Sequence, residues 1–263
     1  MNYLEEIIAH KRQEVEQKKS AGLASKLTGL LHDLPTPRDF ASALSGEAVS
    51  LIAEVKKASP SAGLIRDPFD PVAIAKAYES AGAKALSILT DEKFFQGRLN
   101  DLRTVRESTS LPCLRKDFIV DEIQLLEARV AGADAVLLIV AALDEPELKF
   151  LYDRARSLDL HVLVEVHNEP ELERALQLGT PIIGINNRDL TRMEVSLNTT
   201  VQLVPKIPED RTIVSESGIK TFADVQMLKM LGVDAVLVGE SLLKQENVQM
   251  AARALMGRKQ LTD

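Results

Sequence analysis

Four stretches of the chain repeat one pattern, and this pattern decides the fold: SAGAKALSIL (80–89), VAGADAVLLI (130–139), QLGTPIIGIN (177–186) and MLGVDAVLVG (230–239). Each holds a glycine of the kind found just after a helix, then a short loop, then an apolar run typical of a buried strand. The copies lie about fifty residues apart, which is room for two strand–helix units. Four copies therefore predict eight such units.

Eight apolar segments fit this pattern, and amphipathic segments lie between them. The predicted strands are 48–55, 84–90, 111–116, 134–140, 160–166, 181–186, 211–216 and 234–239. Strands that alternate with helices form a parallel sheet, and eight units predict a (β/α)8 TIM barrel. The alternative is a doubly wound sheet, which the absence of a G-x-G-x-x-G motif after the first strand disfavours.

The predicted barrel leaves an N-terminal extension, so we expect one domain over 1–263 with the eight units in 48–257. Residues 1–47 stand outside the units. The spacing of Leu4, Ile7, Ile8 and Val15 predicts one or two extra helices that cap the barrel.

The composition excludes several kinds of partner. The chain has 263 residues, a formal net charge of −7 and a pI near 5.3, so no broad basic surface for nucleic acid is expected. The longest apolar run, 135–143, is too short to span a bilayer, and the charged N-terminus does not resemble a secretory signal. We expect a cytoplasmic protein that binds a small molecule, and a monomer, because no further segment is reserved for a partner.

Charged side chains follow the apolar part of several predicted strands. Because side chains alternate along a strand, Glu54, Lys56, Lys116, Glu165 and Asn186 should all point to the barrel axis. A single such residue is usually just solvated. A buried cluster of charges, however, costs several kcal/mol, so the set favours a functional site over a stabilising feature.

Two loops carry a pattern typical of phosphate binding. SESGI (215–219) and VGESL (238–242) place glycine beside serine directly after the seventh and eighth strands. TIM barrels often bind phosphate there, through backbone N–H groups and the start of a short helix. Ser59, in the first loop, could donate a hydroxyl to the same phosphate.

Other reactive residue types give weaker signals. The four histidines have no metal-binding spacing, so no metal site is expected. His167 follows Glu165 on the outward side and is interpreted as an ordinary loop histidine. Alternation turns Cys113 toward the helices, which disfavours a nucleophile. Phe94 and Phe95 either form an apolar wall over a site or simply pack within their loop.

The motifs together resemble the indole-3-glycerol phosphate synthase family. They are EVKKASPSAG (54–63), TDEKFFQG (90–97), LRKDF (114–118), LVEVH (163–167), GINNRDL (184–190), SESGI and VGESL. The resemblance covers nearly the whole chain, including the N-terminal extension. It departs at Arg98, where many relatives have a small residue or histidine after the loop glycine.

The resemblance implies a ring closure that needs no cofactor and releases carbon dioxide and water from an anilino deoxyribulose phosphate. It implies catalytic roles for Lys116, Lys56, Glu165, Glu54, Asn186 and Ser217, substrate-binding roles for Arg188, Phe95, Phe118, Leu137, Ile139 and Leu190, and phosphate-binding roles for Ser59, Gly218, Gly239, Glu240 and Ser241. Core packing is an equal alternative for Leu137 and Ile139.

Among the implied roles, Lys116 protonates the carbonyl, and burial beside a second lysine is expected to lower its pKa. Lys56 holds the substrate carboxylate and can act as a second acid. Glu165 stabilises positive charge or takes a proton, and Glu54 binds hydroxyls and places the lysines. Which lysine makes which proton transfer stays open. The rival functions are a sugar-phosphate isomerase and a barrel that binds its ligand without catalysis.

Overall fold

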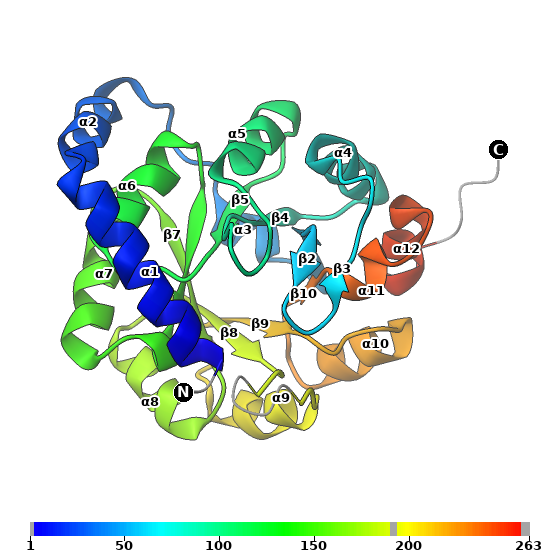
Figure 1. Ribbon diagram of the computed structural model, residues 1–263. Coiled ribbons are helices and arrows are strands. Elements are labelled where there is room, and N and C mark those ends of the chain that lie inside the picture. The colour runs from blue at the N-terminus through cyan, green and yellow to red at the C-terminus, as the bar shows by residue number, and fades with distance from the viewer. Residues whose placement is uncertain (1–2, 190–193, 259–263) are drawn as a thin grey trace.

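The computed structural model describes residues 3–189 and 194–258, and a closed parallel sheet forms its centre (Figure 1). Its strands are β1 (Ser50–Val55), β4 (Ala85–Leu89), β5 (Cys113–Lys116), β6 (Ala135–Ile139), β7 (His161–Val166), β8 (Ile182–Asn186), β9 (Thr212–Glu216) and β10 (Ala235–Val238). Hydrogen bonds join them in the order β1-β10-β9-β8-β7-β6-β5-β4 and back to β1. The predicted (β/α)8 barrel is confirmed, and the doubly wound alternative is wrong, because that sheet would have two open edges.

Helices follow the strands and form the outer ring. They are α4 (Pro71–Ala81), α5 (Leu99–Ser108), α6 (Glu122–Val130), α7 (Glu145–Ser157), α8 (Glu169–Gln177), α9 (Asn198–Leu203), α10 (Phe222–Met230), α11 (Glu240–Leu243) and α12 (Val248–Leu255), with short 3-10 helices η2 (Val140–Ala142) and η3 (Val204–Lys206). Polar residues cap several of them. At α7, Asp144 accepts the N–H of Glu147, and Glu147 accepts the N–H of Asp144, which satisfies donors that a helix start leaves open.

The two faces of the barrel strands form separate apolar clusters, as alternation predicts. Inside the barrel lie Ile52, Ala85, Leu114, Ala135, Leu137, Ile139, Leu163, Ile182, Val214, Ala235 and Leu237. The outer residues, including Val162, Val164, Val166 and Cys113, pack against the helices. The outward assignment of Cys113 is confirmed.

The N-terminal extension contains more helices than expected. It forms α1 (Tyr3–Ser20), α2 (Leu23–Gly29), η1 (Leu31–Asp33) and α3 (Phe40–Leu44). Phe40 and Leu44 join the inner cluster and close the amino end of the barrel. α1 packs against α6 and η2 (Figure 1) and brings its first turns to the opposite end, where Ile7 reaches the cavity described below. The extension thus caps both ends of the barrel.

Two very short strands, β2 (Ala58–Ser59) and β3 (Gly63–Leu64), form an antiparallel hairpin after β1.

Among the described helices, none is long and apolar enough to cross a membrane.

Candidate active site

The carboxyl ends of the barrel strands surround a cavity of about 700 Å³. The predicted site residues that line it are Glu54, Lys56, Ser59, Phe95, Lys116, Phe118, Leu137, Ile139, Glu165, Asn186, Arg188, Ser217, Gly218, Gly239, Glu240 and Ser241. Leu190, the remaining predicted residue, lies outside the described residues. The structure therefore gathers at one place side chains that are spread over nearly two hundred positions of sequence.

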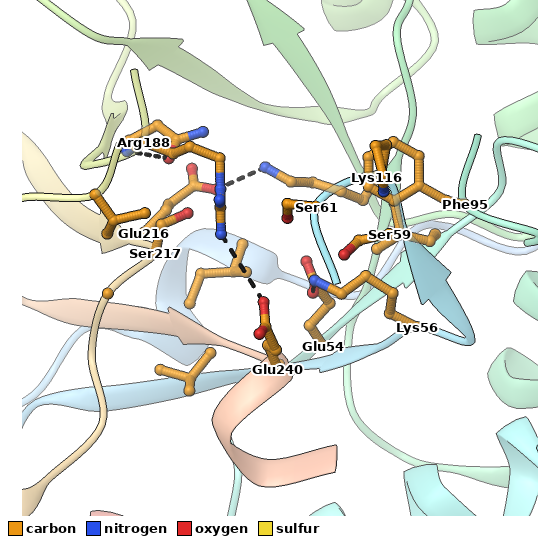
Figure 2. A pocket seen from close by; sticks show the side chains of 18 of the residues that line it. Glu54, Lys56, Ser59, Ser61, Phe95, Lys116, Arg188, Glu216, Ser217 and Glu240 are labelled. Atoms are coloured by element: carbon orange, nitrogen blue, oxygen red, sulfur yellow. Dashed lines mark hydrogen bonds and ion pairs between the residues drawn. The ribbon is translucent and has the colours of Figure 1, made fainter. Parts of the chain in front are cut away.

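Lys116 lies between two buried carboxylates at the base of this cavity. Its Nζ donates to Glu165 Oε2 at 2.8 Å and to Glu216 Oε2 at 2.6 Å. Both carboxylates are 1% exposed, and the three residues stand on alternate strands β5, β7 and β9. Figure 2 shows the Lys116 side chain extending to Glu216, with Lys56 beside Glu54.

The sequence interpretation missed Glu216, which also lines the cavity. A signal was present, because Val214 is an inner-face residue and the side chain two positions later must share its face. The glycine–serine pattern of the SESGI loop drew the assignment to Ser217 and Gly218 instead.

Glu216 is a carboxylate in addition to the predicted Glu54 and Glu165, and it overturns the expected pKa of Lys116. Burial alone would lower the pKa, but Glu165 and Glu216 outweigh it and hold the pKa well above the ordinary lysine value. The neighbouring lysine does not act as expected either, since Lys56 forms an ion pair with Glu54. Lys116 is therefore a charged ammonium at neutral pH.

The two carboxylates beside Lys116 differ in their affinity for protons. Burial raises the pKa of Glu216 to about 7, helped by the negative charge of Glu165 and opposed by Lys116. Burial acts on Glu165 too, but Lys116 and His167 together keep the pKa of Glu165 well below its usual range. Glu165 is thus the fixed anion, and Glu216 is the group that can gain or lose a proton near neutral pH.

Two glycines make room for the buried carboxylates. A Cβ at Gly184 on β8 would lie 2.5 Å from Glu216 Oε1, and a Cβ at Gly239 would overlap the Glu54 side chain. Close packing at these distances allows no side chain, so the two glycines shape the cavity floor.

The predicted phosphate end lies where the loops after β9 and β10 meet. Ser217 and Gly218 both have left-handed backbones, with φ of 67° and 81°, and Gly239 directly precedes α11. Ser241 Oγ donates to the carbonyl of Ile219 at 3.1 Å, and Ser59 Oγ accepts the N–H of Ala62 at 3.2 Å. Ser241 thus donates its hydroxyl hydrogen to the protein, whereas the Ser59 oxygen acts as an acceptor within its own turn.

Cations surround this end of the cavity. Glu240 accepts from Lys244 Nζ at 2.7 Å and lies 3.9 Å from Arg188 Nη2. Asn186 Oδ1 accepts the backbone N–H of Arg188 at 3.0 Å, which fixes the turn after β8.

The two adjacent phenylalanines have different surroundings, so each interpretation holds for one of them. Phe95 lines the cavity and packs on Phe118, with ring centroids 6.0 Å apart. Phe94 instead contacts the rings of Tyr3 and His10 on α1. Leu137 and Ile139 belong both to the inner cluster and to the cavity wall.

His167 is not the ordinary loop histidine that was expected. Its Nε2 lies 3.3 Å from Glu165 Oε1, and its Nδ1 lies 2.9 Å from Glu171 Oε2. Cys113 is inert, because burial raises the pKa of its thiol to about 12. Within residues 3–189 and 194–258, no group of three or more side chains could hold a metal ion.

Comparisons with known proteins show which proteins this chain resembles. The family model described as indole-3-glycerol phosphate synthase matches residues 4–255. A protein of that name from Rhodopirellula baltica is 50% identical over 97% of this chain and 99% of its own length. Another from Acidithiobacillus ferrooxidans is 52% identical over 92% and 93%, respectively. Among solved structures, a 3-hexulose-6-phosphate synthase matches with a TM-score of 0.63 at 14% identity over 80% of this chain and 99% of that one, which supports the fold alone.

Proposed function

The chain belongs to the indole-3-glycerol phosphate synthase family of tryptophan biosynthesis, and from this premise we propose how its side chains carry out the reaction. The enzyme is a decarboxylating lyase. Its reaction converts 1-(2-carboxyphenylamino)-1-deoxyribulose 5-phosphate into indole-3-glycerol phosphate, carbon dioxide and water.

The bond changes define what the site must supply. The ring carbon that bears the carboxylate attacks the sugar carbonyl carbon, and the carbonyl oxygen takes up a proton. The bond between the ring carbon and the carboxylate then breaks. Carbon dioxide leaves, and the electron pair of the broken bond stays with the ring. Finally the new hydroxyl leaves as water with a second proton, and the adjacent carbon loses a proton. The site therefore needs an acid, a base, an anion facing the positively charged nitrogen, and an anchor for phosphate.

The observation that carries the proposal is the position of Lys116 between Glu165 and Glu216 at the cavity base. Lys116 donates the proton to the carbonyl oxygen. Because Glu216 has a pKa of about 7, it can return a proton to Lys116 and accept one during dehydration. General acid–base catalysis typically contributes about 10²–10⁴-fold to a rate.

Other polar side chains orient the substrate. Glu165 is the anion that faces the positive charge on the nitrogen. Lys56 holds the substrate carboxylate, and Glu54 keeps the ammonium of Lys56 in place through their ion pair. Asn186, Arg188 and Ser217 complete the polar wall.

The remaining assignments concern the two ends of the substrate. Ser59, Gly218, Gly239, Glu240 and Ser241 surround the phosphate, chiefly through backbone N–H groups, and Lys244 adds charge. Phe95, Phe118, Leu137 and Ile139 hold the aromatic ring. Leu190 is proposed for this wall on the resemblance alone. Holding both ends aligns the reacting carbons, and such alignment lowers the barrier further.

We also propose that the chain acts as a single-domain monomer in the cytoplasm, without cofactor, nucleic acid or membrane. A single cooperative unfolding transition and a mass near 28.9 kDa by light scattering are the expected results.

The decisive experiment supplies the purified protein with the anilino deoxyribulose phosphate and follows indole fluorescence. Product formation is expected. A protein that binds this substrate at micromolar concentration and yields no indole would instead be a binding barrel. One that forms the substrate from phosphoribosylanthranilate would be the isomerase.

A further inference from the structure

His167 lies directly behind the site, outside the residues that line the cavity. It follows the last residue of β7, and its side chain turns toward Glu165 on the same strand end. Its two ring nitrogens face carboxylate oxygens of Glu165 and Glu171. Nδ1 is hydrogen-bonded to Glu171, whereas the buried Nε2 approaches Glu165 at ion-pair distance without a hydrogen bond. Two carboxylates this close to the ring favour its charged form.

The partner on the far side, Glu171, is itself held in place. Asn168 Nδ2 donates to Glu171 Oε1 at 2.6 Å, and the N–H of Glu171 donates to Asn168 Oδ1 at 3.0 Å. The N–H of His167 also donates to Glu171 Oε2 at 2.8 Å. Glu171 stands in the first turn of α8, where the helix dipole favours an anion. The carboxylate that holds the imidazole ring is therefore itself fixed at the start of a helix.

Both oxygens of Glu165 thus face a cation, although only Oε2 is hydrogen-bonded to one. Oε1 faces His167, and Oε2 accepts from Lys116. In contrast, Glu216 accepts from Lys116 through Oε2, while its buried Oε1 has no hydrogen-bond partner among the described residues. The difference between the two carboxylates thus comes from the second cation beside Glu165. Burial alone would lower the pKa of His167, but Glu165 and Glu171 outweigh it and raise the pKa to about 10.

We propose that His167 is a positioning residue for the synthase reaction: as an imidazolium bridging Glu165 and Glu171, it keeps Glu165 anionic and leaves proton exchange to Glu216. The inference rests on the proposed function. The charged groups around His167 are Glu165 from β7 and Glu171 from α8, and behind Glu165 stand Lys116 from β5 and Glu216 from β9.

The test compares His167→Gln with His167→Lys. Glutamine removes the charge, so kcat should fall about 10- to 100-fold, which is the size expected when a buried carboxylate loses one charged neighbour. KM should change little, because His167 does not line the cavity. The kcat profile of His167→Gln should also gain an acidic limb, since Glu165 becomes able to take up a proton. His167→Lys restores a positive charge and should recover most of the rate and the original profile.

The outcomes separate this inference from the proposed function. If the wild-type protein forms no indole, the proposed function fails. If wild type is active and His167→Gln keeps its kcat and pH profile, only the positioning role is wrong. Equal loss in the glutamine and lysine variants would also overturn it, because charge would then not matter.

A second measurement needs no variant that must fold. Nuclear magnetic resonance of the histidine side chains should show the His167 ring still protonated at about pH 9, well above the ordinary histidine pKa near 6.5. His161, whose pKa burial holds below the usual value, serves as the internal comparison. Titration of His167 near pH 6.5 would contradict the proposal.

Discussion

Two lysines of this molecule, the buried Lys11 and the partly buried Lys116, each pair with buried carboxylates, but only Lys116 lines the cavity. In the cavity cluster, Lys116 lies 2.8 and 2.6 Å from Glu165 and Glu216. In the anchoring cluster, defined as Lys11, Asp91 and Asp117, Lys11 of α1 lies 3.0 Å from Asp91 and 3.1 Å from Asp117. In both, burial would lower the lysine pKa, but carboxylates raise it far above the ordinary value: Glu165 and Glu216 at Lys116, and Asp117, Asp91 and Glu14 at Lys11.

The two clusters differ in their position relative to the cavity. Lys116, Glu165 and Glu216 all line the cavity, whereas in the anchoring cluster Asp117 lines it and Lys11 and Asp91 do not. Lys11 joins the N-terminal helix to the loops after β4 and β5, and Asp91 also accepts the N–H groups of Phe94 and Phe95. Burial, pairing and a shifted pKa are thus shared by a structural cluster and a catalytic candidate, and the access of a ligand to the lysine separates them.

The largest effect should come from Lys116→Met. Loss of the acid should lower kcat about 10²–10⁴-fold. The stability cost should be smaller than for other buried pairs, because Glu165 keeps His167 as a partner and Glu216 can take up a proton. Indole fluorescence gives kcat, and urea denaturation gives the unfolding free energy. The exposed Lys149, paired with Asp153, supplies the control Lys149→Met with unchanged kcat. A Lys116→Met protein with wild-type kcat would remove Lys116 from catalysis.

Lys11→Met should have the largest effect on folding. It leaves Asp91 and Asp117 buried without their shared cation, and breaking a buried pair costs about 3–5 kcal/mol. Asp117 retains Arg115 at 3.0 Å, so the lower part of this range is expected. Urea denaturation measures the unfolding free energy. A loss under about 1 kcal/mol, typical of an exposed ion pair, would show that the other contacts of the helix are enough to hold it.

Glu216→Gln tests the proton affinity of the cavity cluster. The native pKa of Glu216 is raised to about 7, so folding disfavours its ionised form. Wild-type stability should therefore fall relative to the variant as pH rises from about 4.5 to about 7, by roughly 3 kcal/mol at 1.36 kcal/mol per pKa unit. The difference should stay constant above that range. Denaturation curves across these pH values measure it.

The control is Glu240→Gln, because Lys244 outweighs burial and lowers the pKa of Glu240. A lowered carboxylate pKa affects stability only below the unfolded value, so this variant should track wild type across the same range. A flat difference for Glu216→Gln as well would contradict the raised pKa.

The smallest effect belongs to Arg12→Ala, next to Lys11 on the same helix. Arg12 pairs with Glu147 of α7 at 2.9 Å, and its side chain is 48% exposed. Exposed pairs contribute about 0–1 kcal/mol, so the unfolding free energy should change by less than 1 kcal/mol. A loss equal to that of Lys11→Met would mean that any contact between α1 and the barrel matters equally.

The barrel and the direction of several site side chains could be predicted from the sequence, because they depend on local patterns. Glycine-ended helices, apolar strands and side-chain alternation determine the barrel and the inward direction of Glu54, Lys116 and Glu165. Lys11 also had a local signal, since it lies four residues from both Ile7 and Val15 and so shares their buried face. Its burial was nevertheless not predicted, because only the apolar residues of this helix were considered.

The rest depends on contacts between distant segments. The pKa of Lys116 is set by Glu165 and Glu216, which lie 49 and 100 residues away. The contacts of His167 could not be predicted, because side-chain alternation no longer applies after a strand ends. Its second partner, moreover, comes from the first turn of the next helix. Such partners follow from tertiary packing rather than from spacing.

The division of roles between the two lysines is tested by measuring kcat per folded molecule for Lys11→Met and Lys116→Met, side by side at saturating substrate. We predict that Lys11→Met keeps at least about a tenth of the wild-type kcat, while Lys116→Met falls to about a thousandth, within the range of general acid catalysis. Equal losses, or a larger loss in Lys11→Met, would contradict the division between an anchoring cluster and a catalytic one.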